Sequence, residues 1–350
     1  DLFATEPGRG APASINFVSC HDGFTLTDLT RYRSKHNEAN GENNNDGSSV
    51  NHSANFGVEG VTDDPDVIAA REQAAMNMIG MLLLSLGTPM MLAGDEFRNT
   101  QDGNNNAYCQ DNDITWLKWD WMYSTNKTRE MRRLETVSRL VALRKSLDLY
   151  HHEDFFTRLT QLGLLKPSSR VQWFLPDGTT PMERDWFDLG VRSFTMRLLS
   201  NSEVDVCIVV NGTADDRTFR LPPDTHWTPK WCSAEINGRR AGHGTQVEEC
   251  DLNGDTTVWT QHVPDASETV LKMVKEVAMQ RTESSTENEA DTIKFAMPVT
   301  DHAANGTSSA PRDEVSADMP DAPVDDTPDT PVDDNVWTMP ALSITLMKQV

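Results

Sequence analysis

Polar side chains follow two apolar segments of this chain. Residues 14–18 (SINFV) have the pattern of a short buried strand, and His21 and Asp22 come directly after it. Residues 88–93 (TPMMLA) form a second apolar run, which is followed by the acidic tripeptide at residues 94–96 (GDE). The carboxyl ends of parallel strands meet at one edge of a sheet, where barrel enzymes build their active sites. We therefore expect both polar segments on one rim.

Carboxylic acids on one rim suit glycoside hydrolysis. That reaction needs one acid to protonate the leaving oxygen and one carboxylate to act as nucleophile or base. Acidic residues that follow strands are also common as helix caps and as solvated loop charges. Taken alone, the residue types leave the catalytic and the structural interpretation open.

Helices are predicted between and after these two apolar segments. Asp64 is a suitable N-cap with Pro65 at the first helical position, and Gly87 supplies the stop. The last turns of this helix are apolar on nearly every face, which predicts burial. A second helix is expected over residues 128–146, with Leu134, Val137, Val141 and Arg144 at helical spacing. The pattern indicates a repeated β/α unit, and we assign residues 1–149 to one α/β domain.

The second half of the chain has a different pattern. Short strand candidates lie between turns and predict an all-β domain over residues 150–264, with strands at 171–174, 194–198, 204–210, 218–221 and 257–259. Residues 265–335 are rich in Asp, Glu, Pro, Ser and Thr, so we expect a disordered acidic insertion. Residues 336–350 contain one alternating segment, which is predicted to return as the last strand of the β-domain.

Composition excludes several classes of partner. The net charge of −23 over 350 residues argues against nucleic acid and against anionic membranes, whereas a neutral polysaccharide stays compatible. The longest apolar run, residues 78–86, is too short to cross a bilayer. The five cysteines are widely spaced without a CxxC pair, so a reducing compartment and a cytoplasmic protein are expected. The oligomeric state is left open.

The Asn-rich loop at residues 33–55 has some features of a calcium site. Aligning Gly47 with the EF-hand glycine puts Glu42, Asn44 and Asp46 on ligand positions, but the position of the bidentate acid falls on Ser53. The pattern fails, so we predict no metal. Phosphate-binding and dinucleotide-binding motifs are also missing, and no cofactor is expected.

A second Asn-rich segment contains candidates for sugar binding. Asn104 and Asn106 offer amide groups for hydroxyls, and Tyr108 offers an aromatic ring for a sugar face. The same residue types also stabilise turns, and the sequence does not choose between these interpretations.

Several segments together resemble a known family. Residues 16–26 (NFVSCHDGFTL) are similar to the fourth sequence region of the α-amylase superfamily, glycoside hydrolase family thirteen. Three further segments narrow the resemblance to bacterial isoamylase-type glycogen debranching enzymes: residues 35–42, 87–96 and 106–112. The resemblance is strong over residues 1–121 and looser in the β-domain. It implies the last two β/α units, strands seven and eight, of a (β/α)8 TIM barrel, followed by a C-terminal β-sandwich.

The resemblance also implies roles for individual residues. Asp22 would be the carboxylate that stabilises the oxocarbenium-like transition state, and His21 would bind the same sugar. Asn104, Asn106 and Tyr108 would line the substrate groove. Asp95 and Glu96 are expected to have a structural, hydrogen-bonding role.

The nucleophile and the acid/base of the retaining mechanism have no counterpart here. In the family they follow barrel strands four and five, and no segment of this chain resembles those motifs. We expect the full-length protein to hydrolyse α-1,6 branch linkages of a branched α-glucan, glycogen or limit dextrin. This chain alone is predicted to be inactive and prone to aggregation, because an open sheet edge and the inner face of the 78–86 helix would lack partners. A non-catalytic carbohydrate-binding protein and an α-1,4-acting or transglycosylating relative remain as alternatives.

Overall fold

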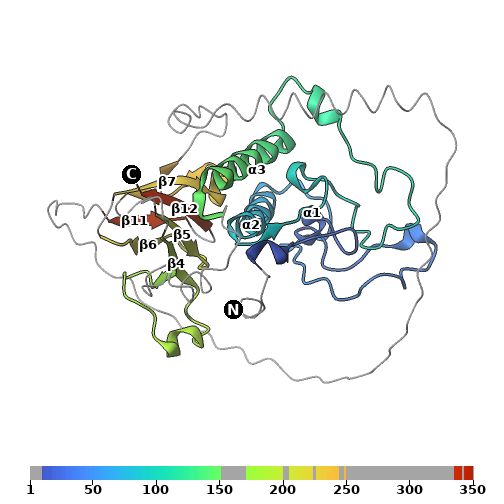
Figure 1. Ribbon diagram of the computed structural model, residues 1–350. Coiled ribbons are helices and arrows are strands. Elements are labelled where there is room, and N and C mark those ends of the chain that lie inside the picture. The colour runs from blue at the N-terminus through green and yellow to red at the C-terminus, as the bar shows by residue number, and fades with distance from the viewer. Residues whose placement is uncertain are drawn as a thin grey trace, which may run out of the picture. The chain divides into compact units, whose positions relative to one another are not determined.

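The computed structural model describes residues 10–150, 171–199, 205–223, 226–243, 248–249, 335–340 and 343–349. These residues all belong to one compact unit, in which an α/β part is followed by a β-rich part (Figure 1). The predicted insertion lies outside the described residues except for Asn335. The strand expected at 257–259 lies outside them as well.

The first long helix, α2 (Pro65–Leu84), begins where the sequence predicts. The Asp64 side chain accepts hydrogen bonds from the backbone N–H groups of Asp66, at 2.9 Å, and Val67, at 3.3 Å. The helix ends at Leu84 with Ser85 as the C-cap, a few residues before the predicted stop. Gly87 instead has a φ of 103° and turns the chain into the next strand, because its left-handed conformation favours glycine.

Strands β1 (Ile15–Asn16) and β2 (Thr88–Pro89) pair in parallel, with Ile15 opposite Thr88. The two strands are shorter than the apolar runs that predicted them. Burial of the first segment was predicted wrongly, since Ile15 is 61% exposed and Phe17 is 54% exposed. Within the described part of the chain, β1 and β2 form a sheet of their own, so no further strand covers these side chains.

Helix α3 (Arg129–Ser146) confirms the second helix prediction. Its N-cap is Thr128, whose hydroxyl accepts the backbone N–H of Met131 at 3.2 Å. The buried face presents Leu134, Val137 and Leu140. The remaining helical segments of the α/β part are short: η1 (Ala11–Ala13), α1 (Leu26–Leu29), η2 (Glu38–Asn40), η3 (Asp95–Phe97), η4 (Asp120–Tyr123) and η5 (Asp148–Tyr150).

A buried ionic cluster joins α2 to α3. Glu72 Oε1 lies 2.8 Å from Arg98 Nε, and Glu72 Oε2 lies 2.8 Å from Arg133 Nη2. Burial would raise the pKa of the Glu72 carboxyl, but Arg133 and Arg98 hold it below its ordinary value. Burial lowers the pKa of Arg98 to about 10 although Glu72 opposes that shift. Loss of either partner would leave an uncompensated buried charge, so the cluster fixes how the two helices pack.

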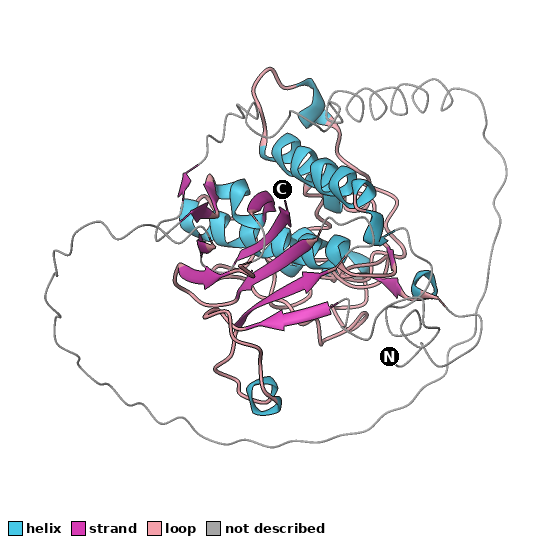
Figure 2. Ribbon diagram, turned by 60° about the vertical axis from the view of Figure 1, so that its left-hand side comes forward, coloured by secondary structure: helices cyan, strands magenta, loops and turns pink. Residues whose placement is uncertain are grey.

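The β-rich part contains a five-stranded antiparallel sheet, whose strands lie side by side in Figure 2. Its order is β3 (Val171–Phe174), β4 (Ser193–Leu198), β5 (Val206–Asn211), β12 (Ser343–Gln349) and β7 (Trp227–Cys232). A three-stranded sheet has the order β6 (Arg217–Arg220), β11 (Val336–Met339) and β9 (Gly242–His243), and β8 (Arg239–Arg240) pairs with β10 (Glu248–Glu249). Short helices η6 (Glu183–Trp186) and η7 (Ser233–Asn237) lie between strands.

The C-terminal segment therefore supplies two strands, whereas the sequence pattern predicted one. Strand β11 enters the small sheet and β12 enters the large one, where β12 pairs with both β5 and β7. Strand β7 was also missed, because Pro229 and Lys230 interrupt its apolar alternation.

Alternate residues of β5 enter two different hydrophobic cores. Val206 and Ile208 belong to the core that the helices share, and Cys207 and Val209 belong to a core between the two larger sheets. The period of two along a strand explains this division. The large sheet is therefore buried on both faces, against the small sheet and against α2 and α3.

The apolar end of α2 packs on the β-rich part, as Figure 1 shows for α2 and β12. Ile79 and Leu83 are 1% and 3% exposed, whereas Met81 is 47% exposed. The expectation that this end of the helix would lack partners is therefore wrong for most of its side chains. Helix α2 is long and apolar enough to cross a membrane, but half of the tested window is buried inside the protein and Glu72 pairs there with arginines. It packs as a core helix.

Gly80 of α2 lies close to Trp231 of the β-rich part. A Cβ atom at this position would lie 2.7 Å from the Trp231 ring. Gly80→Ala should therefore lower the free energy of unfolding by about 1–3 kcal/mol, the usual effect of overpacking, although alanine favours a helix by roughly 1 kcal/mol over glycine. Urea unfolding measures this change. In a Trp231→Phe background, which removes the clashing ring atoms, the same substitution should cost less. A stabilising Gly80→Ala would contradict the close packing.

Candidate functional site

His21 and Asp22 lie at the carboxyl end of β1 with both side chains directed to solvent. Their side chains are 87% and 81% exposed, and His21 Nε2 lies 3.5 Å from Asp22 Oδ2. A carboxylate and an imidazole are thus available, side by side, to a ligand that approaches this rim. Tyr108 is also well exposed, at 70%.

The buried side chain of Asp95 holds the segment that carries His21 and Asp22. The Asp95 side chain is buried, at 2% exposure, and it accepts hydrogen bonds from the Ser19 hydroxyl and, at 2.9 Å, from the Leu26 backbone N–H. Burial raises the pKa of Asp95, although both hydrogen bonds oppose the shift. Asp95 therefore joins the loop after β1 to the loop after β2. The neighbouring Glu96 accepts the Gly94 N–H at 2.8 Å, so both acids have the hydrogen-bonding role that the sequence predicts.

Two further hydrogen bonds hold the backbone of the same segment next to Asp22. The Gly23 N–H donates to the Asn105 carbonyl oxygen at 3.0 Å. The Cys20 thiol donates to the Asp22 carbonyl oxygen at 3.3 Å. Gly23 has a φ of 95°, a left-handed conformation that suits glycine. Both contacts therefore restrain the one peptide group between Asp22 and Gly23, while the Asp22 side chain stays accessible.

Asn105 is held by a reciprocal amide pair with Asn37. Asn37 Nδ2 donates to Asn105 Oδ1 at 2.9 Å, and the Asn105 backbone N–H donates to Asn37 Oδ1 at 3.0 Å. Asn105 Nδ2 donates further to Ser48 O, at 2.8 Å, and to Asn51 Oδ1, at 2.6 Å. Asn37 and Asn105 are 0% and 2% exposed. The pair therefore joins the loop at residues 33–55 to the segment around residue 105.

The sequence did not predict the pair of Asn37 and Asn105 or the close packing of Gly47 beside it. Gly47 has a φ of 72°, and a Cβ there would lie 2.7 Å from Asn37 Nδ2 and 2.9 Å from Asn106 Cβ. The high density of asparagine in both segments was the available signal, because an amide both donates and accepts and can satisfy a second amide.

The two other sugar-binding candidates lie inside this hydrogen-bonded network. Asn104 is 2% exposed, donates from Nδ2 to Asn40 Oδ1 at 2.9 Å and accepts the Asn106 backbone N–H at 2.9 Å. Asn106 Nδ2 donates to Asp46 Oδ2 at 3.0 Å. These contacts favour the turn-stabilising interpretation for Asn104. Asn106 is half-buried, and its candidate role in sugar binding stays a prediction.

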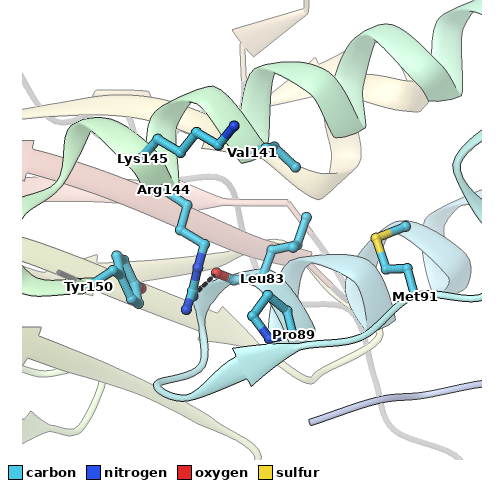
Figure 3. A pocket seen from close by; sticks show the side chains of 7 residues that line it. All are labelled: Leu83, Pro89, Met91, Val141, Arg144, Lys145 and Tyr150. Carbon is cyan, nitrogen blue, oxygen red and sulfur yellow. Dashed lines mark hydrogen bonds between the residues drawn. The ribbon is translucent and has the colours of Figure 1, made fainter. Parts of the chain in front are cut away.

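An apolar cavity of about 350 Å³ lies away from His21 and Asp22, between α2, β2 and α3 (Figure 3). Arg144 lines it, but its guanidinium donates to Leu83 O at 2.5 Å, to Ser85 O at 2.7 Å and to Gly87 O at 2.8 Å. These bonds satisfy carbonyl groups at the C-terminal end of α2, which is a structural role. In the part of the chain that the structure describes, no three His, Cys, Asp or Glu side chains gather in a way that could hold a metal.

Glu59 closes the loop that contains Asn37. Its carboxylate accepts the backbone N–H groups of Arg33, at 2.9 and 3.1 Å, and Ser34, at 3.1 Å, as well as Asn55 Nδ2 at 2.8 Å. His36 Nε2 lies 3.2 Å away. Burial raises the pKa of Glu59, but the Arg33 N–H and the other partners outweigh it and lower the pKa from 4.5 to about 2.

Comparisons with known proteins find relatives by sequence. No family model matches the chain. The chain is 44% identical over 200 residues to the glycogen operon protein GlgX homolog of Mycobacterium tuberculosis H37Rv, covering 55% of this chain and 26% of that protein. It is 39% identical over 236 residues to the Haemophilus influenzae protein of the same name, which covers 66% of this chain and 32% of that protein. It is 38% identical over 242 residues to the glycogen debranching enzyme of Pectobacterium atrosepticum, which covers 69% of this chain and 34% of that protein. The chain thus spans about a quarter to a third of the length of these curated relatives.

Two solved structures show weaker similarity. Pullulanase type I from Bacillus subtilis, complexed with maltose, matches with a TM-score of 0.41 and 20% identity, over 63% of this chain and 24% of that one. The catalytic module of the pneumococcal glycogen-degrading virulence factor SpuA matches with a TM-score of 0.47 and 11% identity, over 100% of this chain and 38% of that one.

The chain is therefore similar in sequence to part of the bacterial proteins named glycogen operon protein GlgX homolog and glycogen debranching enzyme.

Asn105→Asp tests the two hydrogen bonds that the Asn105 side-chain amide donates, without a change of side-chain shape. The carboxylate cannot donate to Ser48 O or Asn51 Oδ1, and a buried charge would face the Ser48 carbonyl. We expect a loss of about 2–4 kcal/mol in the free energy of unfolding, since a buried network is broken and a charge is left unpaired. Asn45→Asp, at an exposed position of the same loop, is the matched control and should cost much less. Equal losses in the two variants would show that the buried Asn105 amide stabilises the fold no more than an exposed amide of the loop.

Acid should weaken the Glu59 contacts. Because the folded-state pKa is depressed, this stabilisation is fully present above pH of about 4.5 and is lost as the pH falls through about 2. Glu59→Gln should therefore lower the urea midpoint near neutral pH and flatten its decline from pH of about 6 to about 3. Glu38→Gln removes an exposed carboxylate from the same loop and should keep the wild-type slope. The interpretation fails if Glu59→Gln keeps that slope as well.

Proposed function

We propose that this chain forms part of the active site of a glycoside hydrolase that cleaves α-1,6 branch linkages of glycogen or limit dextrin. The exposed pair of His21 and Asp22, on a segment held at Ser19, Gly23 and Leu26, is the observation that carries the proposal. The names of the curated relatives, glycogen debranching enzyme among them, support the substrate class.

In the proposed mechanism Asp22 stabilises charge and does not attack. A glycosidic transition state resembles an oxocarbenium ion, so a carboxylate that hydrogen-bonds the sugar hydroxyls and faces the developing positive charge lowers the barrier. The Asp22 side chain is open to such a contact, and His21 beside it can hydrogen-bond the same ring. Because the peptide group after Asp22 is restrained, little reorganisation of this segment accompanies the reaction.

The remaining carboxyl groups of this rim do not suit the roles of nucleophile and acid/base. Asp95 is buried and its two oxygens accept from Ser19 and Leu26, and Glu96 accepts from Gly94. The retaining mechanism needs two reactive carboxyl groups about 5–5.5 Å apart. We infer that both belong to another part of the full-length protein and that this chain alone does not hydrolyse glucan.

The proposed place of this chain in the enzyme is the end of a (β/α)8 barrel. The parallel pair of β1 and β2, with α2 between them and α3 after them, supports their assignment as barrel strands seven and eight. The exposed Ile15 and Phe17 would then be covered by the rest of the barrel. A cytoplasmic location is part of the same proposal, and the free cysteines Cys20, Cys109, Cys207 and Cys232 are compatible with it.

A non-catalytic carbohydrate-binding protein is the second candidate. The structural use of Asp95 and Glu96 is the observation that favours it, because the described rim then has no reactive pair of acids. An α-1,4-acting relative is a further candidate within the enzyme class, since a stabilising carboxylate such as Asp22 does not choose the linkage.

Asp22→Asn in the full-length protein separates the candidates. Removal of an electrostatic stabiliser of the transition state should reduce kcat/KM for limit-dextrin debranching by about 100- to 1000-fold, while glycogen binding changes little. Asp113→Asn, which neutralises another exposed acid, is the matched control and should leave both unchanged. Unchanged debranching by Asp22→Asn would refute the catalytic role. Glycogen binding by a full-length wild type that releases no branches would favour the binding protein, and release of α-1,4-linked products would favour the α-1,4-acting relative.

A further inference from the structure

The Lys35 side chain ends among three backbone carbonyl groups of one turn. Lys35 Nζ lies 2.7 Å from Asp46 O, 3.1 Å from Asn45 O and 3.2 Å from Gly47 O. An ammonium group has three N–H donors and no acceptor, so three convergent carbonyl oxygens satisfy it. We call the three carbonyl groups of residues 45–47 the carbonyl cage.

The turn that forms the cage has an unusual backbone. Gly41, Asn43, Asn44 and Gly47 all have positive φ angles, of 79°, 53°, 59° and 72°. Glycine and asparagine are the residues that adopt this left-handed region most readily. The carbonyl oxygens of residues 45–47 converge on one point, and the positive charge of Lys35 at that point offsets the repulsion between the carbonyl dipoles. The chain thus places a cation of its own at the centre of the turn.

The turn is also attached to Asn37. The carbonyl oxygen of Asp46 accepts from Asn37 Nδ2 at 2.9 Å in addition to Lys35 Nζ. Asn44 Oδ1 accepts the Asn37 backbone N–H at 2.9 Å, and Asn44 Nδ2 returns a hydrogen bond to Lys35 O at 3.1 Å. Lys35 and Asn37 are therefore two residues apart in the same loop, and both form hydrogen bonds to the turn at residues 44–47.

From Asn37 the contacts continue to the reactive segment. Asn37 holds Asn105 through two hydrogen bonds, and the Asn105 carbonyl accepts the N–H of Gly23, the residue after Asp22. A displaced turn would remove the Asp46 carbonyl from Asn37, free its amide to rotate and release Asn105. The position of the Asp22 backbone then depends on a charge held in a different loop.

We propose that Lys35 is a positioning residue whose ammonium group closes the carbonyl cage and thereby holds Asp22 in place through Asn37, Asn105 and Gly23. The catalytic consequence rests on the proposed function, whereas the positional part does not. An uncharged side chain that is one atom shorter, such as methionine, fills the space along the lysine stem without satisfying the carbonyl groups. Lysine at this position therefore acts through its charge and donors rather than through its volume.

The test is chemical rescue in the full-length protein. In Lys35→Ala the Gly23 amide should exchange its hydrogen about tenfold faster, the factor expected when one hydrogen bond is lost, and kcat for debranching should fall with little change in KM. Added n-propylammonium should restore both readouts because it can occupy the empty cage. Lys35→Met, which fills the space with an uncharged chain, should show the same defect and should not be rescued. Lys118→Ala removes an exposed lysine and is the matched control, with no defect expected.

Each outcome decides the proposal. Unchanged Gly23 exchange in both Lys35 variants would overturn it, as would equal rescue of Lys35→Ala and Lys35→Met by n-propylammonium. If Lys35→Ala folds only in the presence of n-propylammonium, the cage requires a cation as proposed, and Lys35→Met then supplies the exchange comparison. If Gly23 exchange responds as expected while the wild type has no debranching activity, the positional inference stands and the proposed function fails.

Discussion

The hydrogen bonds between Asn37 and Asn105 join two loops that are 68 residues apart in the sequence. Both side chains are buried, so each unmade hydrogen bond would leave a polar group without water to replace its partner. The pair is formed completely, and it sets the position of the Asn105 carbonyl that accepts the Gly23 N–H. The exposed side chains of His21 and Asp22 are therefore presented by a segment whose own freedom is small. The buried side-chain amides of Asn37 and Asn105 thus help to position the exposed carboxylate of Asp22.

The helices provide the frame to which these loops are attached. Arg71 of α2 donates to Gly60 O at 2.6 Å and to Asn55 O at 2.8 Å, which ties the end of the long loop to the helix. Glu72, one residue on, pairs with Arg98 and Arg133 and so connects the same helix to α3 and to the segment after β2. Further along the helix, α2 packs on Trp231 of the β-rich part through Gly80. The rim that carries Asp22 thus depends on a core that both parts of the chain share.

Sequence patterns predicted the local features well. The predicted cap Asp64 depends on hydrogen bonds to residues two and three positions away, so the signal lies in a few adjacent residues. The burial of residues 14–18 was predicted wrongly, because exposure depends on what covers the strand and not on its own side chains. Strand β7 was missed because Pro229 and Lys230 break its alternation, while pairing with β12 still holds it in the sheet. Tertiary contacts decided these positions.

The candidate site also combines residues that the local sequence predicted with residues that only tertiary contacts reveal. His21 and Asp22 were identified because they follow a strand within a motif of adjacent residues, and the structure places them on an exposed rim. The supporting pair of Asn37 and Asn105 could not be recognised, since any of the many asparagines in these loops could have paired with another. Choosing the correct pair requires the geometry of both loops together with the space that Gly47 leaves beside them.

Hydrogen exchange at the Gly23 amide in the unliganded wild-type protein tests the central claim most directly. If buried amides hold the Asp22 segment in advance of any substrate, Gly23 should be protected to a degree similar to Leu26, whose N–H is bound by the buried Asp95 carboxylate. Exchange of Gly23 at the rate of an unstructured peptide, with Leu26 still protected, would show that Asp22 is not positioned by Asn105 and would contradict the account.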